Sequence, residues 1–286
     1  MPVDKSASAE TRLGDSGLSE SGFSHIDSTS NPSDYVRRLD ATGASQVWQD
    51  IKHQMLLHLD LKPGEHCLDV GCGTGEDVLA MAQIVGDRGR AVGLDRSITM
   101  VNEAQRRARE LTAEFYVQDA NQLEFPNSSF NAVRVERVLQ HLERPRTALS
   151  EMARVAVPGG RVVAAEPDYG TLAITGADPE VTRRILGCRL RHFRSGRVGL
   201  HLPLLFKSLG LDHVRVTLIH SSSTELSQTG DYSRLCKYAA SAQEEGTVSA
   251  EDAELWLSRL VEAAAGGRYN QTITVFLVSG RKRVPE

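Results

Sequence analysis

The sequence predicts an α/β fold in which helices cover both faces of a doubly wound, mainly parallel sheet. Between residues 66 and 166, short apolar segments alternate with segments of helical periodicity, as strand–helix–strand units require. The first apolar segment runs directly into a glycine-rich turn, and three of these segments end at or beside an aspartate. Because the carboxyl ends of parallel strands meet at one edge of a sheet, we expect a ligand site at that edge.

The elements follow from the N-terminus in order. Residues 1–30 are rich in Ser, Gly, Asp and Glu and are predicted to be a disordered tail. Residues 31–286 are predicted to be one domain, which begins with a helical cap over 31–60. The first strand begins at residue 66, and further strands are predicted over 91–95, 114–118, 130–135, 161–166, 214–219 and 272–278. Helices are predicted after the glycine turn and over 98–110, 146–157, 179–193 and 250–265.

The turn at residues 71–75 is the predicted ligand site. Glycines at positions 71, 73 and 75 allow a positive φ and remove the Cβ atoms that would hold a bound molecule away from the backbone. A pyrophosphate-binding fingerprint requires a glycine at position 76, where this chain has Glu76. Asp69 and Asp77 add further negative charge. The turn therefore favours a nucleoside that carries cationic groups, and it disfavours a nicotinamide dinucleotide and hence an oxidoreductase.

Two more aspartates follow the next two predicted strands. Asp95 lies twenty residues after Gly75, where a carboxylate can accept hydrogen bonds from the two hydroxyls of a ribose. Asp119 follows the third strand. Together with Asp69, these side chains place an acid at three strand ends, which indicates a nucleoside cofactor.

The segment from Asp69 to Gly75 resembles the first motif, Asp-x-Gly-x-Gly-x-Gly, of the class I S-adenosylmethionine-dependent methyltransferases. The segment Val138-Leu139-Gln140-His141-Leu142 resembles the Val-Leu-x-His-Leu segment of their small-molecule members. The resemblance implies a Rossmann-like sheet of order 3-2-1-4-5-7-6 whose last strand is antiparallel, and it implies that Asp119 takes the adenine amine. It also implies a set of cofactor-binding residues: Asp69, Gly71, Cys72, Gly73, Gly75, Asp95, Arg96, Met100, Asp119, Ala120, Glu136 and Arg137.

Residues 171–209 are predicted to be a helical lid inserted after the fifth strand, because this segment is too long for a plain connection. Its cationic residues form either an anion receptor for the acceptor or a solvated helix face: Arg183, Arg184, Arg189, Arg191, His192, Arg194 and Arg197. Four candidates for a general base are His141, Glu166, Tyr169 and His192. Each of them also has a structural interpretation, in the core or as a helix cap.

Composition limits the possible partners. The 286 residues are 24% charged with a formal net charge of −4, which argues against a nucleic-acid substrate. No apolar run has the roughly 18 residues that a membrane span needs. The four cysteines form no Cys-x-x-Cys pair, so we expect neither a metal site nor disulfides, and a reducing cytoplasm is the simplest location. The oligomeric state is left open.

The predicted function is transfer of a methyl group from S-adenosylmethionine to a small-molecule acceptor of the secondary-metabolite class. The acceptor is expected to be anionic if the cationic segment is an anion receptor. The atom methylated is left open as O, N or C. The alternative is a chain that keeps the cofactor fold but catalyses a cyclisation or serves as a binding module, because cofactor and acceptor are contacted by different residues.

Overall fold

The computed structural model describes residues 26–29, 31–108, 112–226 and 231–285. Most of the tail predicted over 1–30 lies outside these residues. Residues Ile26–Ser28 form a short 3₁₀ helix, η2, whose Asp27 accepts hydrogen bonds from the backbone amides of Ile98 and Thr99. This part of the predicted tail thus contacts the start of a helix, because Asp27 supplies acceptors for the first amides of that helix.

The sheet has seven strands in the order β3-β2-β1-β4-β5-β7-β6, which confirms the predicted order. Strands β1 to β5 pair in parallel, whereas β7 is antiparallel to both β5 and β6, as predicted. The strands are β1 His66–Val70, β2 Arg90–Asp95, β3 Ala113–Val117, β4 Phe130–Glu136, β5 Ala156–Thr175, β6 Leu211–Ser223 and β7 Asn270–Lys282.

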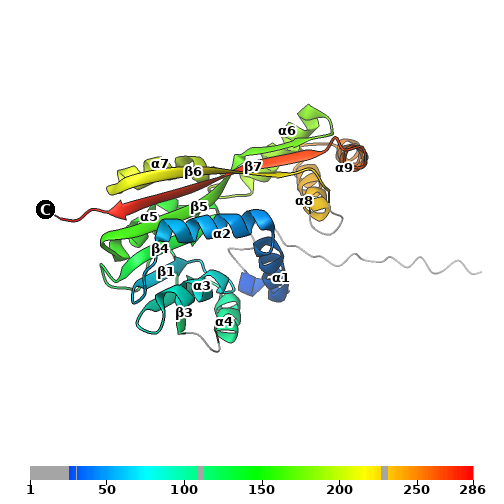
Figure 1. The fold of residues 1–286 in the computed structure, drawn as a ribbon. Helices are drawn as coiled ribbons and strands as arrows, with labels where there is room; N and C mark the ends of the chain where they lie inside the picture. The colour runs from blue at the N-terminus through cyan, green and yellow to red at the C-terminus, as the bar shows by residue number, and fades with distance from the viewer. Residues whose placement is uncertain (1–25, 30, 109–111, 227–230, 286) are drawn as a thin grey trace, which may run out of the picture.

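Helices cover both faces of this sheet (Figure 1). One face packs against α2 Gln46–Leu59, α3 Glu76–Val85 and α4 Ile98–Arg107 through a core that includes Ile51, Met81 and Val101. The other face packs against α5 Pro145–Val155 and α7 Val198–Ser208 through Leu149 and Leu202. A first helix, α1 Pro32–Gly43, follows η2 near the start of α4. The two apolar layers are what the helical periodicity of the sequence predicted.

The last three strands are longer than predicted. The fifth strand was predicted to end at residue 166, but β5 continues to Thr175, which pairs with Asn270 of β7, and the register shifts between Asp168 and Ala173. The pairing of β4 with β5 ends at Glu136 and Ala165. Beyond that point β5 has a partner on one side only, so Pro167 can lack an N–H group without breaking a ladder.

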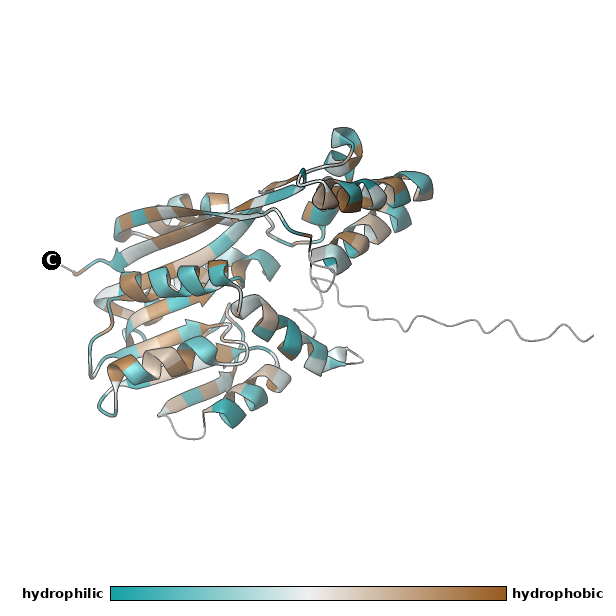
Figure 2. Cartoon of the chain, turned by 45° about the vertical axis from the view of Figure 1, so that its right-hand side comes forward, coloured by the Kyte–Doolittle hydropathy of each residue, from teal (hydrophilic) through white to brown (hydrophobic). Residues whose placement is uncertain are grey.

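Three helices pack together at the far ends of β5, β6 and β7 (Figure 1): α6 Pro179–Arg191, α8 Asp231–Glu244 and α9 Ala250–Ala265. Their shared core contains Trp256, whose Nε1 donates to Thr182 Oγ1 at 2.8 Å. Figure 2 shows apolar residues recurring among polar ones along these helices, as expected for elements that bury one face each. The structure thus divides the predicted lid, because α6 joins this helical group while α7 packs on the sheet. The sequence analysis missed α8. No helix among the described residues combines the length and apolar character that crossing a membrane requires.

Candidate functional site

A cavity of about 990 Å³ opens at the carboxyl ends of β1, β2 and β4, where the strand order reverses. Eleven of the twelve residues predicted to bind cofactor line it: Asp69, Gly71, Cys72, Gly73, Asp95, Arg96, Met100, Asp119, Ala120, Glu136 and Arg137. Three of the four predicted base candidates also line it: His141, Tyr169 and His192. Gly75 and Glu166 lie outside the lining. The topological switch point thus brings together residues from distant parts of the sequence, as doubly wound sheets do.

The glycine turn is shaped by its packing on neighbouring elements. Gly71 has a φ of +74°, and a Cβ placed there would lie 2.3 Å from a methyl carbon of Val138. Gly75 has a φ of +83°, and its Cβ would lie 2.8 Å from both Ala104 and Phe115. At these two positions the atoms that exclude a side chain therefore belong to the protein. The sequence analysis explained the glycines by the room that a bound molecule needs. These contacts show instead that a side chain at Gly71 or Gly75 would collide with the protein itself.

Asp95 connects the end of β2 to the glycine turn. Its Oδ2 accepts from the backbone N–H of Gly73 at 3.0 Å, and its Oδ1 accepts from that of Ser97 at 2.9 Å. Burial raises the pKa of Asp95 above its ordinary value. The carboxylate is thus held at the cavity wall in a fixed orientation, where it can accept hydrogen bonds from hydroxyl groups. Asp119, at the end of β3, is exposed and accepts from the backbone and side-chain nitrogens of Asn121.

A fully buried arginine, Arg134 of β4, joins three carboxylates beneath the cavity. Its nitrogens lie 3.3 Å from Asp69, 2.9 Å from Asp77 and 2.6 Å from Glu136. The parallel register places Arg134 directly beside Asp69 of β1. Burial raises the pKa of Asp69 to about 7 despite the arginine. For Asp77, burial acts in the same direction, but Arg134 and Lys52 outweigh it and hold its pKa below the ordinary value.

Two other cations share the same carboxylates. Lys52 Nζ lies 2.7 Å from Glu76 and 2.9 Å from Asp77, and Arg137 Nε lies 3.1 Å from Glu136. The sequence analysis counted the acids around the turn but not these cations. Lys52 and Arg134 neutralise much of the negative charge around the glycine turn. This charge therefore disfavours a pyrophosphate less strongly than the sequence predicted. An arginine in the middle of the apolar strand 130–135 was the available indication of such a buried network.

Arg137 occupies an unusual backbone conformation just past β4. Its φ is +55°, a region that non-glycine residues seldom adopt, and its guanidinium lies over the ring of Trp48 at 4.2 Å from the centroid. Strained backbone of this kind concentrates at functional sites. Trp48 also lines the cavity, and the sequence analysis did not identify it.

An aromatic group stands beside the predicted base residues. The ring of Tyr169 stacks on that of Phe193 with centroids 3.8 Å apart, and the His141 ring lies 5.8 Å from Phe193. The buried guanidinium of Arg189 lies 4.1 Å from the centroid of Phe193 and 4.9 Å from that of Tyr238. Stacking and cation–π contacts thus fix the positions of Tyr169 and Arg189 in the cavity wall.

Glu166 is buried away from the cavity. Its Oε1 accepts from the backbone N–H groups of Val138 at 2.8 Å and Leu139 at 2.7 Å, which begin the short 3₁₀ helix η3, Leu139–His141. Burial raises its pKa to about 8. This geometry favours a structural role for Glu166, as the anchor of the segment that carries His141, over its predicted role as a base.

The cationic segment predicted on α6 separates into two groups. Arg189, His192 and Arg194 line the cavity, whereas Arg183, Arg184, Arg191 and Arg197 do not. Arg183 pairs with Glu180 on the exposed surface, as the solvated-face interpretation predicts. The anion-receptor interpretation thus remains a prediction, and it can apply only to Arg189, His192 and Arg194.

Comparisons with known proteins agree with this geometry. Residues 61–186 match a family model described as a methyltransferase domain. An uncharacterized 37.1 kDa protein in transposon TN4556 of Streptomyces fradiae is 34% identical over 254 residues, which cover 86% of this chain and 70% of that protein. A demethylmenaquinone methyltransferase of Bacillus cereus is 34% identical over 117 residues, which cover 40% of this chain and only 49% of that enzyme.

A solved structure supports the fold. A putative methyltransferase from Bacillus halodurans C-125 superposes with a TM-score of 0.57 at 16% identity, covering 82% of this chain and 99% of that one. At this identity the match concerns the fold alone. The matched segment contains the glycine turn and the strand ends that line the cavity, so this domain belongs to the class I S-adenosylmethionine-dependent methyltransferases, with S-adenosylmethionine as its cofactor.

Proposed function

We propose that this methyltransferase acts on a small anionic acceptor, of the specialised-metabolite class, bound in one half of the cavity. The observation that carries the proposal is a division of the lining by charge. We divide the lining residues by their position in the chain. Those up to position 137, which we call the cofactor half, mix acids with cations. Among the described lining residues from 138 onward, the acceptor half, Glu143 is the only carboxylate, against five cations: Arg144, Arg189, Arg194, Arg234 and Lys237.

The residues of the cofactor half fit S-adenosylmethionine. Asp95 and Asp119 stand at successive strand ends on the cavity wall and offer acceptors to ribose hydroxyls and to an adenine amine. Met100 is fully buried and provides an apolar surface between them and α1. Asp69 and Glu136 would face the cationic amino-acid end, with Arg134 holding both carboxylates in place.

The acceptor half has the size and charge for a small molecule. Ligand pockets for small molecules typically have about 300–1,000 Å³, so a cavity of about 990 Å³ has room for a cofactor and a compact acceptor. Arg189 is held rigidly among aromatic rings, which lowers the entropy lost when it binds an anion. Arg189 of α6 and Arg234 and Lys237 of α8 all line the cavity, and these three are the proposed anion-binding groups.

The proposed chemistry needs little from the protein beyond alignment and proton removal. When bound, S-adenosylmethionine supplies an electrophilic methyl carbon on a sulfonium sulfur. Holding the acceptor nucleophile in line with that carbon supplies a large part of the rate, and a base that removes its proton adds roughly 10²–10⁴-fold. We assign the base to His141 of η3 or Tyr169 of β5, both of which line the cavity. His192 is a weaker candidate because its Nε2 contacts Glu245.

The test is a paired acceptor panel. Small carboxylates and phosphate monoesters that carry a hydroxyl or amine are assayed beside their neutral amides and esters, with formation of S-adenosylhomocysteine as the readout. We expect turnover of anionic members only. The double variant Arg234→Met with Lys237→Met should raise the KM for these acceptors about tenfold or more, because a charged hydrogen bond to the acceptor is lost. It should leave the Kd of S-adenosylhomocysteine unchanged.

Arg183→Met is the matched control, because Arg183 is exposed and lies outside the cavity. Equal turnover of neutral and anionic members, or an unchanged KM in the double variant, would contradict the anionic acceptor. Tight binding of S-adenosylhomocysteine without turnover of any panel member would instead favour the cyclase or binding-module alternative. His141→Asn and Tyr169→Phe, compared by their kcat–pH profiles, would identify the base.

A further inference from the structure

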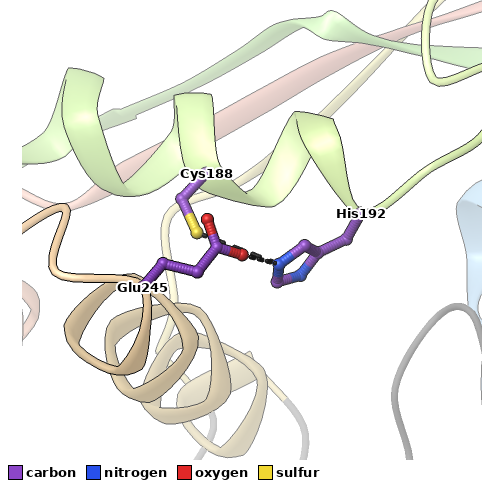
Figure 3. A group of neighbouring side chains, drawn as sticks. All are labelled: Cys188, His192 and Glu245. Carbon is purple, nitrogen blue, oxygen red and sulfur yellow. Dashed lines mark hydrogen bonds and ion pairs between the residues drawn. The ribbon is translucent and has the colours of Figure 1, made fainter.

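Three side chains that are not among the proposed anion-binding groups converge beside the acceptor half. Cys188 lies on α6, His192 lies one turn later at the end of that helix, and Glu245 follows the last residue of α8 (Figure 3). His192 Nε2 lies 2.5 Å from Glu245 Oε1 and 3.9 Å from Cys188 Sγ. One sulfur, one nitrogen and one oxygen thus lie within 4.8 Å of one another.

This arrangement does not have the geometry of a cysteine–histidine–carboxylate triad. In such a triad the nucleophile and the carboxylate contact different nitrogens of the imidazole. Here Cys188 and Glu245 both approach Nε2 of His192. Atoms that converge on one point are the arrangement of metal ligands.

The surroundings hold the three groups in place. The second oxygen of Glu245, Oε2, accepts from Arg191 Nη2 at 2.9 Å, and Arg191 also donates to Thr247 Oγ1 at 3.3 Å. Metal-binding carboxylates are commonly oriented by such a hydrogen bond to the oxygen that does not bind the metal. Cys188 is buried in the core shared by α6, α8 and α9, which fixes the sulfur.

We propose that Cys188, His192 and Glu245 bind a zinc ion, with water as the fourth ligand. A thiolate, an imidazole and a carboxylate in a tetrahedral arrangement suit Zn²⁺, whereas Mg²⁺ and Ca²⁺ select oxygen ligands. On binding, the thiol of Cys188 loses its proton to solvent and the sulfur bonds to the ion. The ion would then connect α6 to the end of α8 at the wall of the acceptor half, where His192 lines the cavity.

The sequence analysis predicted no metal because it sought closely spaced cysteine pairs. Cys188 and His192 are four residues apart on one helix, but the third ligand lies 53 residues after His192. Only the packing of α6 on α8 brings it near. This proposal is independent of the acceptor's identity.

The experiment uses the full, untagged chain after treatment with a chelator. Titration with Co²⁺, as a spectroscopic substitute for Zn²⁺, should give the charge-transfer absorption of a thiolate–cobalt bond and saturate at one ion per chain. Zn²⁺ should displace the Co²⁺ and raise the Tm of the wild-type chain. Cys188→Ser should lose the absorption. His192→Ala and Glu245→Gln should weaken Zn²⁺ binding by more than the roughly 10–100-fold that loss of an orienting partner costs.

Two control variants make the result specific. Cys236→Ser removes a half-buried thiol of α8 outside the cluster, and His201→Ala removes an exposed imidazole of α7. Both should bind Co²⁺ as the wild-type chain does. The proposal is overturned if Co²⁺ binds without thiolate absorption, if Cys188→Ser binds Zn²⁺ as tightly as the wild-type chain, or if the Tm does not respond to Zn²⁺.

Discussion

Replacing Arg134 with methionine tests whether one buried cation holds the cofactor half together. Arg134 is fully buried and contacts Asp69, Asp77 and Glu136 at 2.6–3.3 Å. Methionine keeps much of the length of the side chain and removes the charge. Asp77 would still pair with Lys52, and Glu136 would still pair with Arg137. Within the described part of the chain, no other cation lies at ion-pair distance from Asp69.

The expected loss is therefore that of one unpaired buried charge and not of three. Removing one partner of a buried pair typically costs about 3–5 kcal/mol in the free energy of unfolding. For a chain of this size, that loss lowers Tm by about 6–20 °C. Urea unfolding followed by tryptophan fluorescence measures it directly, and the slope m should remain unchanged.

The pH dependence of the deficit provides the sharper test. Without Arg134, the folded-state pKa of Asp69 rises further above its ordinary value, so the folded variant binds more protons than the folded wild-type chain. Protonation then offsets the missing cation, so the difference in stability should shrink as the pH falls through the variant's raised pKa to about 7, the folded pKa of Asp69 in the wild-type chain, and stay constant well below it. Adding Asp69→Asn to Arg134→Met should restore part of the loss, because the double variant leaves no unpaired charge on Asp69.

Arg183→Met serves as the control here as well, because its ion pair with Glu180 is exposed and such pairs contribute about 0–1 kcal/mol. A deficit below about 1 kcal/mol for Arg134→Met would refute the role assigned to the buried cation. So would a large deficit that stays constant with pH.

Three further predictions concern single side chains. Asp95→Ala should raise the Kd of S-adenosylhomocysteine at least about tenfold by calorimetry, from the loss of charged hydrogen bonds, and an unchanged Kd would remove the ribose assignment. Glu166 has a folded pKa of about 8, so its contribution to the free energy of unfolding is lost as the pH rises from about 4.5 to 8. Glu166→Gln cannot titrate but keeps an acceptor for the two amides. The urea midpoint of this variant should therefore change less with pH over that range than the midpoint of the wild-type chain. Gly75→Ala should cost about 1–3 kcal/mol more than Gly64→Ala, because both glycines have positive φ but only at Gly75 would a Cβ meet other side chains; equal unfolding free energies of the two variants would contradict this.

The sequence predicted those elements whose pattern is local. The glycine turn, the alternation of strands and helices and the capped helix over 250–265 can be read from neighbouring residues. The lengths of β5, β6 and β7 could not, since they depend on antiparallel pairing between residues that lie 48 to 120 positions apart in the chain. The helix α8 was missed because its apolar face is completed only by contact with α6 and α9.

The same distinction applies to the site. Residues at strand ends were found because the doubly wound topology fixes where such ends meet, and the resemblance supplied their roles. Trp48, Lys52 and the buried function of Glu166 were not found, because each depends on a partner more than twenty residues away in the chain. The periodicity of the sequence does not show which distant residues pack against one another.

The charge of the cofactor half shows why this matters for function. From the sequence, Asp69, Glu76 and Asp77 appeared to create a strongly negative turn, whereas the structure distributes these carboxylates and Glu136 over Lys52, Arg134 and Arg137. A site of this kind does not attract a cationic cofactor by net charge alone. It presents carboxylates whose positions are fixed by buried cations, so recognition depends on where each oxygen lies and not on the total charge. Removing a cation from this network should therefore impair cofactor binding even though it makes the site more negative.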